Sequence, residues 1–414
     1  MAFLFMTTTK EKLDRLEMEM TRGKDISITN LVDYFIESAH RSRVSDIHID
    51  PLVGKIIVRF RIDGILREMY SFPKSLHGEI ISRIKVLSGM RTDEHQTAQD
   101  GRFRYIFSDQ GVVDLRVSIL PTYHGENAVL RLLSDKAENF SLKDLGFREE
   151  ERKKIITALK KPNGMILATG PTGSGKTTTL YTMLKMLKSP EISIITIEDP
   201  IEYAIEEVKQ IQVNARTGLS FANGLRSILR QDPNIIMVGE IRDSETANIS
   251  VNTALTGHLL LSTLHTNDAA TTLPRLLDMG IEEYLVASTV SIAISQRLVR
   301  KICPDCKENL EMNESARESL AKTALVKMIK KDQKIFRGKG CDKCNQSGYV
   351  GRVAINEVLV ADNVIREAIL RKASAAELRN IATKHGMKTM LEDGFSKAEE
   401  GLTTIEEILR VTHE

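Results

Sequence analysis

The pattern of hydrophobic positions predicts two domains of different construction. Over residues 27–43 and again over residues 77–90, apolar side chains recur every three or four positions, the period of an amphipathic helix. Between and after these segments, short stretches alternate apolar and polar positions, as strands with one buried face do. These stretches are residues 46–50, 55–64, 101–107, 112–120 and 129–133, with a polar turn at 108–111 inside a predicted hairpin. Residues 27–135 are therefore expected to form a small α+β domain.

Farther along the chain the pattern changes. Continuous apolar runs of strand length alternate with longer helical segments, which favours a parallel sheet covered by helices. The runs are residues 165–169, 192–197, 235–238 and 259–264. We expect this α/β domain to span residues 149–300, after a polar linker at 136–148. Residues 301–350 then surround a cysteine framework, and residues 351–414 predict a helical C-terminal region.

Composition limits the partners rather than naming a function. The chain has 414 residues, of which 58 are Lys or Arg and 56 are Asp or Glu, for a formal net charge of +2. This balance gives no support to a direct nucleic-acid partner, because nucleic-acid binders usually show a marked basic excess. No segment approaches the roughly 18 continuous apolar residues that span a bilayer. We therefore expect a cytoplasmic protein without a transmembrane segment.

The start of the chain predicts a leader helix over residues 1–26. Residues 1–6 are apolar but lack the basic start and the cleavage site of a signal peptide. Charges within residues 10–24 fall at helical spacing, which fits either a solvated helix or an amphipathic docking element.

The strongest chemical feature is a phosphate-binding loop directly after the first apolar run. The segment matches G-x-x-x-x-G-K-[ST], in which glycines let backbone N–H groups turn toward a β-phosphate. Its residues are Gly170, Pro171, Thr172, Gly173, Ser174, Gly175, Lys176 and Thr177, followed by Thr178. Lys176 is expected to reach the β- and γ-phosphates of ATP, and the Thr177 hydroxyl to bind Mg²⁺. A glycine-rich turn without nucleotide is the alternative, and the flanking strand and helix argue against it.

Two carboxylates follow later strands of the predicted sheet. Glu198 ends the second apolar run and Glu240 follows the third, so both are expected at the edge of the sheet where the phosphate loop lies. Burying a carboxylate is costly without a partner, which favours a role in holding Mg²⁺ or orienting water. Asp199 either joins these groups or caps the turn before Pro200.

Two histidines flank the fourth apolar run. His265 follows the run and is placed to sense a γ-phosphate, whereas His258 precedes it at the far end. A structural histidine with satisfied hydrogen bonds is the common case in such places, so the residues alone leave both roles open.

All four cysteines fall in two Cys-x-x-Cys pairs. Cys303 pairs with Cys306, and Cys341 with Cys344. Two such pairs can surround one Zn²⁺ with four thiolates and leave no open position, which is typical of a structural site. The long segment between the pairs requires a subdomain that folds back. A redox pair and a catalytic metal site are the alternatives, and a cytosolic setting disfavours disulfides.

Four segments, taken together, resemble the sequence boxes of secretion ATPases. They are residues 170–179, 197–202, 236–243 and 256–267. Residues 45–49 and 59–64 resemble the second N-terminal domain of the GspE/PilB branch, which drives type II secretion and type IV pilus assembly. The resemblance runs from about residue 27 to the end of the chain. It implies a RecA-like P-loop ATPase core, a PAS-like α+β domain, a tetracysteine zinc subdomain and a helical C-terminal tail.

The resemblance also implies roles for residues of the ATPase core. Glu198 matches the carboxylate of the Asp box, and Glu240 matches the Walker B glutamate. His258 and His265 match the His-box pair. These assignments add to the placement that the strand pattern predicts.

Members of this family act as ring hexamers with nucleotide between their two domains. Arg102 and Arg116 fall where family arginines reach the phosphates, and a guanidinium suits the charge that develops there. A surface arginine on a hairpin is the alternative for each. Only about 25 residues precede the matching region, so the usual further N-terminal domain is not expected here.

These features predict an ATP-hydrolysing hexameric motor that powers the export of pilin or pseudopilin subunits. The expected partner is a polytopic inner-membrane platform protein, through which the chain associates peripherally with the inner membrane. A DNA-uptake motor and a pilus retraction motor are alternatives in the same class, and the tetracysteine pairs favour assembly over retraction. A zinc-dependent nucleic-acid-binding module is disfavoured by the balanced charge and an aromatic content of 5%.

Overall fold

The protein has two compact units, each with its own hydrophobic core. The computed structural model describes residues 27–107, 111–134, 140–310 and 335–412. The chain divides into residues 1–137 and residues 138–414. The predicted leader helix at residues 1–26 lies outside the described residues.

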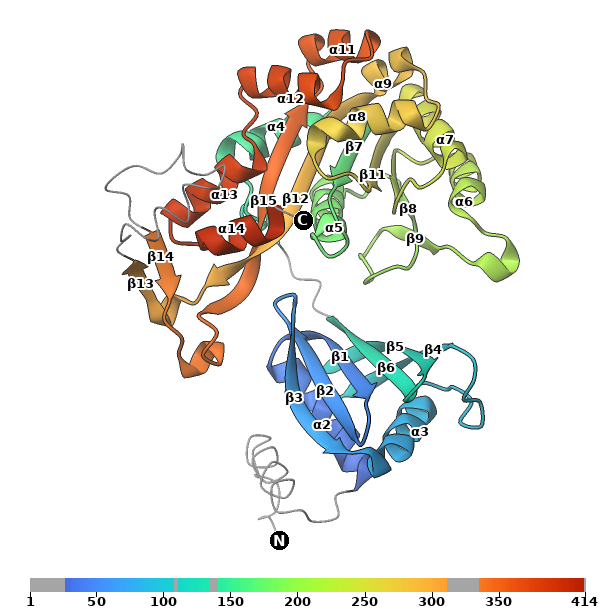
Figure 1. The fold of residues 1–414 in the computed structure, drawn as a ribbon. Coiled ribbons are helices and arrows are strands. Elements are labelled where there is room, and N and C mark those ends of the chain that lie inside the picture. The colour runs from blue at the N-terminus through green and yellow to red at the C-terminus, as the bar shows by residue number, and fades with distance from the viewer. Residues whose placement is uncertain (1–26, 108–110, 135–139, 311–334, 413–414) are drawn as a thin grey trace. The chain divides into compact units, whose positions relative to one another are not determined.

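The first unit is a six-stranded antiparallel sheet with two helices (Figure 1). Its strands pair in the order β3-β2-β1-β6-β5-β4. The elements are α2 (Ile28–Arg41), β1 (Val44–Pro51), β2 (Lys55–Ile62), β3 (Ile65–Pro73), α3 (His77–Leu87), β4 (Gln99–Ile106), β5 (Val112–Thr122) and β6 (Gly125–Ser134). Inward residues of the strands share one core with both helices, so the helices cover one face of the sheet. The predicted helices and hairpin strands are confirmed; the PAS likeness stays a prediction.

Strand β3 was not expected from the sequence. Its outward positions are exposed or half-buried along most of its length, and only Phe72 is buried. The alternation of apolar and polar residues that indicates a half-buried strand is therefore weak. The segment forms a strand because it pairs with β2.

The second unit is built on a seven-stranded sheet in the order β15-β12-β7-β11-β10-β8-β9. All neighbours pair in parallel except β15, which is antiparallel to β12. The strands are β7 (Gly164–Thr169), β8 (Ile194–Glu198), β9 (Lys209–Gln212), β10 (Ile235–Val238), β11 (Leu259–Leu264), β12 (Val290–Ile302) and β15 (Tyr349–Val360). The predicted parallel α/β core is confirmed.

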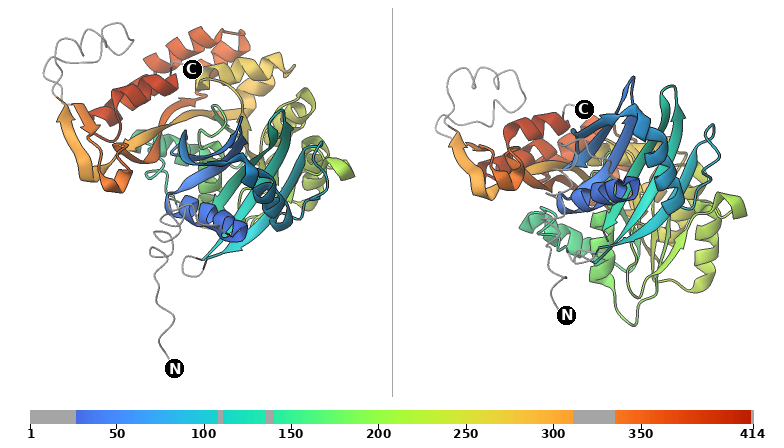
Figure 2. Two further views of the ribbon diagram at one scale, coloured as in Figure 1. Left: turned by 60° about the horizontal axis from the view of Figure 1, so that its bottom comes forward. Right: turned by 90° about the horizontal axis from the view of Figure 1, so that it is seen from below.

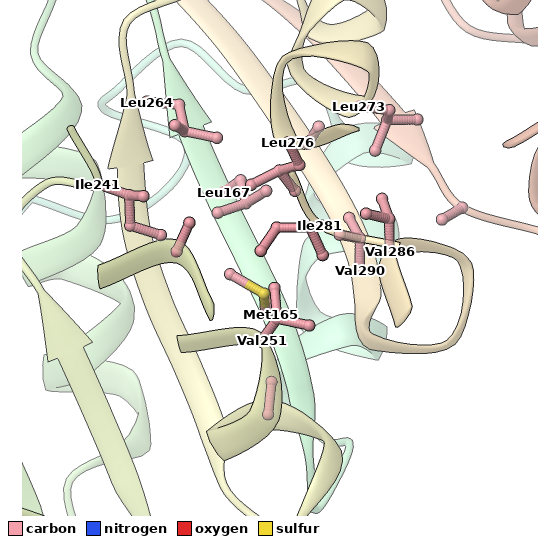
Figure 3. Packing of buried hydrophobic residues seen from close by; sticks show 14 of the residues in the cluster. Met165, Leu167, Ile241, Val251, Leu264, Leu273, Leu276, Ile281, Val286 and Val290 are labelled. Carbon is pink, nitrogen blue, oxygen red and sulfur yellow. The ribbon is translucent and has the colours of Figure 1, made fainter. Parts of the chain in front are cut away.

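Helices cover both faces of this sheet. Their bounds are α4 (Glu149–Leu159), α5 (Lys176–Leu187), α6 (Phe221–Ile228), α7 (Ser244–Leu255), α8 (Ala269–Asp278), α9 (Glu283–Thr289), α11 (Asn363–Leu370) and α12 (Ala375–Lys384). Helices α4 and α5 pack on one face, and the other six pack on the opposite face. Alternate residues of β7 point into the two cores on opposite faces of the sheet. Met165 and Leu167 face the larger core, where Figure 3 shows them beside Val251 and Leu276.

The described part of the predicted linker belongs to the second unit. Leu142 and Phe147 are buried in the core that α4 and α5 form with the sheet. Two apolar residues within a mainly polar segment thus fasten the chain before α4 begins.

The cysteine region and the last two helices lie at one end of the second unit. Strands β13 (Lys307–Leu310) and β14 (Ile335–Gly338) form an antiparallel hairpin, and α13 (Met390–Glu399) and α14 (Ile405–Thr412) pack against β12, β14 and β15. The views in Figures 1 and 2 place this hairpin and α6 at opposite ends of the unit. The C-terminal end is helical from α11 onward, as expected, but the strand β15 that precedes it was not. Within the described ranges, no helix combines the length and apolar content that crossing a bilayer requires.

Candidate functional site

The phosphate loop lies at the carboxyl end of β7, a strand buried along its whole length. It connects directly to α5, which begins at Lys176. Gly170, Gly173 and Gly175 have φ angles of 134°, 78° and 89°, which residues with a Cβ rarely adopt. A Cβ on Gly170 would also lie 2.4 Å from the main-chain oxygen of Gln296. The backbone conformation of this loop therefore requires glycine. A loop that surrounds a phosphate with backbone N–H groups has the same requirement.

The Lys176 ammonium is held at the loop itself. Its Nζ donates to the main-chain oxygens of Gly170, at 2.8 Å, and Pro171, at 3.0 Å. Burial lowers the pKa of Lys176, while the negative charge of Glu240 opposes this shift. The ammonium thus stands where phosphate oxygens can replace two carbonyl acceptors.

The remaining loop residues precede and follow Lys176 along the chain. Pro171 and Thr172 are exposed, whereas Ser174 is buried. Thr177 and Thr178 are half-buried in the first turn of α5. Their placement next to Lys176 is the one that phosphate and Mg²⁺ binding require.

Strand order brings three predicted side chains to the same edge of the sheet. Strands β7, β11, β10 and β8 are consecutive neighbours and run parallel, so their carboxyl ends lie side by side (Figure 1). The phosphate loop follows β7, His265 follows β11, Glu240 follows β10, and Glu198 ends β8. The site is thereby assembled from segments far apart in the sequence.

Glu240 is the centre of a small charged cluster. One oxygen of its carboxylate, Oε2, lies 2.6 Å from Arg242 Nε and 3.2 Å from His265 Nε2. The Glu240 side chain is only 11% exposed, so these partners offset the cost of burying its charge. The same carboxylate acts on Lys176, which links the cluster to the phosphate loop.

Glu198 occupies a different and largely buried network. Tyr181 donates its hydroxyl to Oε2, while Thr196 and Gln210 donate to Oε1 at 2.5 and 3.1 Å. Burial and the Glu198 charge raise the pKa of Tyr181. Because Tyr181 lies on α5, this network ties the end of β8 to the helix that carries the phosphate loop. Asp199 is exposed beside it.

His258 is not part of the cluster. It precedes β11 at the amino end of the sheet, where its main-chain oxygen accepts from Gly164 and its Nδ1 lies 3.2 Å from the oxygen of Thr253. At about 3.3 Å per strand residue, roughly 23 Å separate His258 from His265. The structure thus gives His258 contacts away from the phosphate loop.

Arg102 and Arg116 belong to the first unit. They are directly paired across strands β4 and β5, and Arg116 is paired in turn with Arg131 on β6. Arg102 is exposed and Arg116 is half-buried, while the residues that alternate with them point toward the core. The two arginines therefore share the face of the sheet opposite the helices, and their contact with a nucleotide stays a prediction.

The four cysteines converge on one point. Their sulfur atoms all lie within 4.8 Å of one another. Backbone N–H groups of Cys341 and Gly348 donate to the sulfur of Cys344, each at 3.2 Å. Burial opposes ionisation of Cys344, but these bonds and neighbouring thiols lower its pKa to about 6. A closed set of four sulfurs with supporting N–H donors fits a tetrahedral metal ion.

Gln296 on β12 contacts the phosphate loop and was not expected from the sequence. Its Nε2 donates to the main-chain oxygen of Ser174 at 2.7 Å, and its Oε1 accepts from the Thr179 hydroxyl at 2.8 Å. Both contacts are buried. A polar residue inside the apolar run of β12 is the pattern that could have identified it.

A second missed contact couples β7 to the end of β11. Thr169, the last residue before the loop, donates its hydroxyl to the main-chain oxygen of Thr266 at 2.8 Å and accepts from the Thr266 N–H at 3.1 Å. The segment after His265 is thereby fixed to the strand that carries the phosphate loop. No local sequence motif predicts the contact between Thr169 and Thr266.

Comparison with known proteins decides which class of protein carries this site. The profile of the type II/IV secretion system protein family matches residues 21–410. This chain belongs to that family. As a type II/IV secretion system protein with an intact phosphate loop, it is an ATPase, and its substrate is a nucleotide with Mg²⁺.

Relatives within the type II/IV secretion system family are close in sequence. The chain is 46% identical over 403 residues to type II secretion system protein E of Xanthomonas campestris pv. campestris, covering 97% of this chain and 70% of the relative. It is 45% identical over 385 residues to the type IV pilus assembly ATPase PilB of Thermus thermophilus, covering 92% of this chain and 43% of the relative.

Solved structures agree on the fold. The ATPase DotB of Legionella pneumophila aligns with a TM-score of 0.68 at 22% identity, covering 92% of this chain and 95% of DotB. The pilus retraction motor PilT with bound ADP aligns with a TM-score of 0.62 at 27% identity, covering 92% and 96%. The first likeness shows the fold alone; the second is a likeness to a pilus retraction motor at 27% identity.

Proposed function

We propose that this ATPase is the motor that powers subunit assembly or export in a type IV pilus or type II secretion machine. The observation that carries the proposal is the Glu240 cluster, whose negative charge acts on Lys176 at the edge of the sheet where the phosphate loop lies. Such a cluster serves hydrolysis as well as nucleotide binding. The names of the two relatives at 45–46% identity support the choice of machine.

Hydrolysis follows from the placement of these side chains. Lys176 binds the β- and γ-phosphate oxygens, and Glu240 orients a water molecule in line with the γ-phosphorus. The water oxygen bonds to phosphorus as the bond to the bridging oxygen breaks, so that ADP leaves and the water proton passes to Glu240 or to solvent. Thr177 and Glu240 would hold Mg²⁺, which supplies charge neutralisation at the phosphates.

Glu198 acts through its network rather than by direct contact. Both of its oxygens already accept hydrogen bonds within the core. We assign it to positioning α5 and the end of β8. His265 is then the residue next to Glu240 that senses the γ-phosphate, and a role for His258 rests on family resemblance alone.

The cysteine cluster is proposed to bind structural Zn²⁺. Cys303, Cys306, Cys341 and Cys344 supply four sulfurs and no open position. The metal would join the Cys303 end of β12 to the turn before β15. This role is one of folding, and it is separate from ATP hydrolysis.

The wider assembly is proposed on family resemblance. A homo-hexamer, with Arg102 and Arg116 reaching the phosphates, would act on a polytopic inner-membrane platform protein from the cytoplasmic side. A retraction motor is the second candidate, since PilT shares this fold. The cysteine cluster favours assembly over retraction.

Steady-state ATP hydrolysis with Mg²⁺ tests the proposal on protein fractionated by size. We expect activity in a fraction of roughly six chains, and loss of at least about a hundredfold in Lys176→Ala and in Glu240→Gln. Lys160→Gln, which changes an exposed lysine outside the loop, is the matched control. Folded wild-type protein that binds ATP but hydrolyses none in any fraction would contradict a motor function.

A further inference from the structure

Arg242 stands on a short, firmly anchored loop between β10 and α7. Ile241, just before it, is buried and donates its N–H to the main-chain oxygen of Thr263 at 2.9 Å. Asp243, just after it, caps α7 by accepting from the N–H of Thr246 at 2.7 Å. The backbone of Arg242 is therefore fixed on both sides at the carboxyl edge of the sheet.

The side chain, in contrast, is exposed and directed at the site. Its Nε lies 2.6 Å from Glu240 Oε2, and the side chain is 66% exposed. The hydrogen bond to Glu240 raises the pKa of Arg242, and the charge of Asp199 adds to this effect. A guanidinium has five N–H donors in a planar fork, so the bond from Nε leaves most of that fork to bind other oxygens.

Three nitrogen-bearing side chains gather around a single carboxylate here. Arg242 binds Glu240, His265 shares the same oxygen, and Lys176 feels the same negative charge. A γ-phosphate bound by Lys176 would bring several negative oxygens next to this cluster. Those oxygens would compete with Glu240 for the guanidinium.

We propose that Arg242 is a catalytic residue that passes from the Glu240 carboxylate to the γ-phosphoryl group of bound ATP. This inference rests on the proposed function and deepens it by naming a phosphate-binding arginine within the ATPase unit itself. The exchange has two effects. The guanidinium neutralises charge that develops on the γ-phosphoryl oxygens, and Glu240 is released to orient the attacking water.

Because the γ-phosphate is what draws Arg242 away, the exchange distinguishes ATP from ADP. ADP lacks the competing oxygens, so Arg242 stays bound to Glu240. The carboxylate is then not free to orient a water molecule. The Arg242 side chain therefore has two arrangements, one with ATP bound and one with ADP bound. A purely structural arginine that only positions Glu240 would show no such discrimination.

The test compares Arg242→Gln and Arg242→Lys with wild type. Titrations use fluorescent ADP and a fluorescent non-hydrolysable ATP analogue, each with Mg²⁺, and hydrolysis is measured in parallel. We expect kcat to fall at least about a hundredfold in Arg242→Gln. We also expect the dissociation constant of the ATP analogue to rise about tenfold, while that of ADP stays within about twofold. Arg242→Lys should recover part of the analogue affinity.

Arg226→Gln is the matched control, because Arg226 is also an exposed arginine bound to a glutamate, Glu245, at 2.6 Å. It should leave both affinities and kcat unchanged. Equal weakening of ADP and analogue in Arg242→Gln, or an unchanged kcat, would overturn the inference. Failure of the wild type to hydrolyse ATP would instead contradict the proposed function, so the two failures are distinguishable.

Discussion

The Gln296 side chain holds the phosphate loop from a neighbouring strand. Without its amide, the main-chain oxygen of Ser174 and the hydroxyl of Thr179 would lose buried partners, which costs on the order of 1–3 kcal/mol. We expect Gln296→Leu to weaken Mg²⁺–ATP binding about tenfold. Fluorescent ATP titration measures this, with Thr179→Val expected to show a smaller loss. A folded Gln296→Leu variant with wild-type affinity would show that the loop holds its shape unaided.

Residues of the site divide into those that a local motif encodes and those that only the fold brings together. Lys176 could be placed from the sequence because a strand, a glycine-rich turn and a helix occur within one short segment. The Gln296 and Thr266 contacts could not, since each depends on which strand lies beside β7. Arg242 was visible in the segment after β10, but its partner depends on a side-chain direction that no spacing reveals.

At the scale of elements, one carboxylate fastens α14 to the long strand β12. Glu407 accepts from Arg300 and Arg410, with four bonds of 2.7 to 2.9 Å. Burial opposes its ionisation, yet the bonds from Arg410 and Arg300 prevail and lower the pKa of Glu407 to about 2. The ionised carboxylate thus stabilises the native packing of the C-terminal helices.

This contact makes the stability of the second unit depend on pH. The folded pKa lies below the unbound value of 4.5, so the stabilisation is present above that value and is lost as pH falls toward 2. We expect Glu407→Gln to lower the free energy of unfolding by roughly 2 kcal/mol at pH 7, allowing for solvent screening at the half-exposed Arg410. Urea titrations should show this difference shrinking between about pH 5 and pH 3. A difference that is constant with pH would exclude an ionic origin.

The strands that could be predicted from the sequence are those that are buried on both faces. Strands β7, β10 and β11 are buried on both faces and read as continuous apolar runs. Strand β12 is equally apolar at its start, but it directly follows the short helix α9, so no turn residue separates the two. Strand β15 mixes exposed and buried residues near a glycine, and its place depends on pairing with β12.

At the scale of the whole molecule, the cysteine cluster connects the sheet to the C-terminal helices. Beside Cys303, the Ile302 N–H donates to the oxygen of Leu402 at 2.9 Å; beside Cys306, Lys307 Nζ donates to the oxygen of Glu400 at 3.1 Å. Loss of a bound metal would therefore loosen contacts that lie outside the cluster.

Metal removal should separate stability from nucleotide binding. After treatment with a chelator, we expect amide hydrogen exchange to rise about tenfold or more in β13, β14 and the turn between α13 and α14, because the cluster no longer holds them. Exchange in β7 and β11 and the affinity for ATP should stay near their untreated values. Cys306→Ser without chelator is the independent check. Equal protection before and after treatment would argue against a structural metal.

The length of β12 has a mechanical consequence. This strand of 13 residues is paired along its first half with β7 and along almost its full length with β15. We therefore expect it to move as a rigid element. Gln296 near its middle grips the phosphate loop, and Cys303 follows its end about 23 Å away. We expect a movement of the phosphate loop on hydrolysis to be transmitted along this strand, from Gln296 near its middle to the cysteine cluster beyond its end.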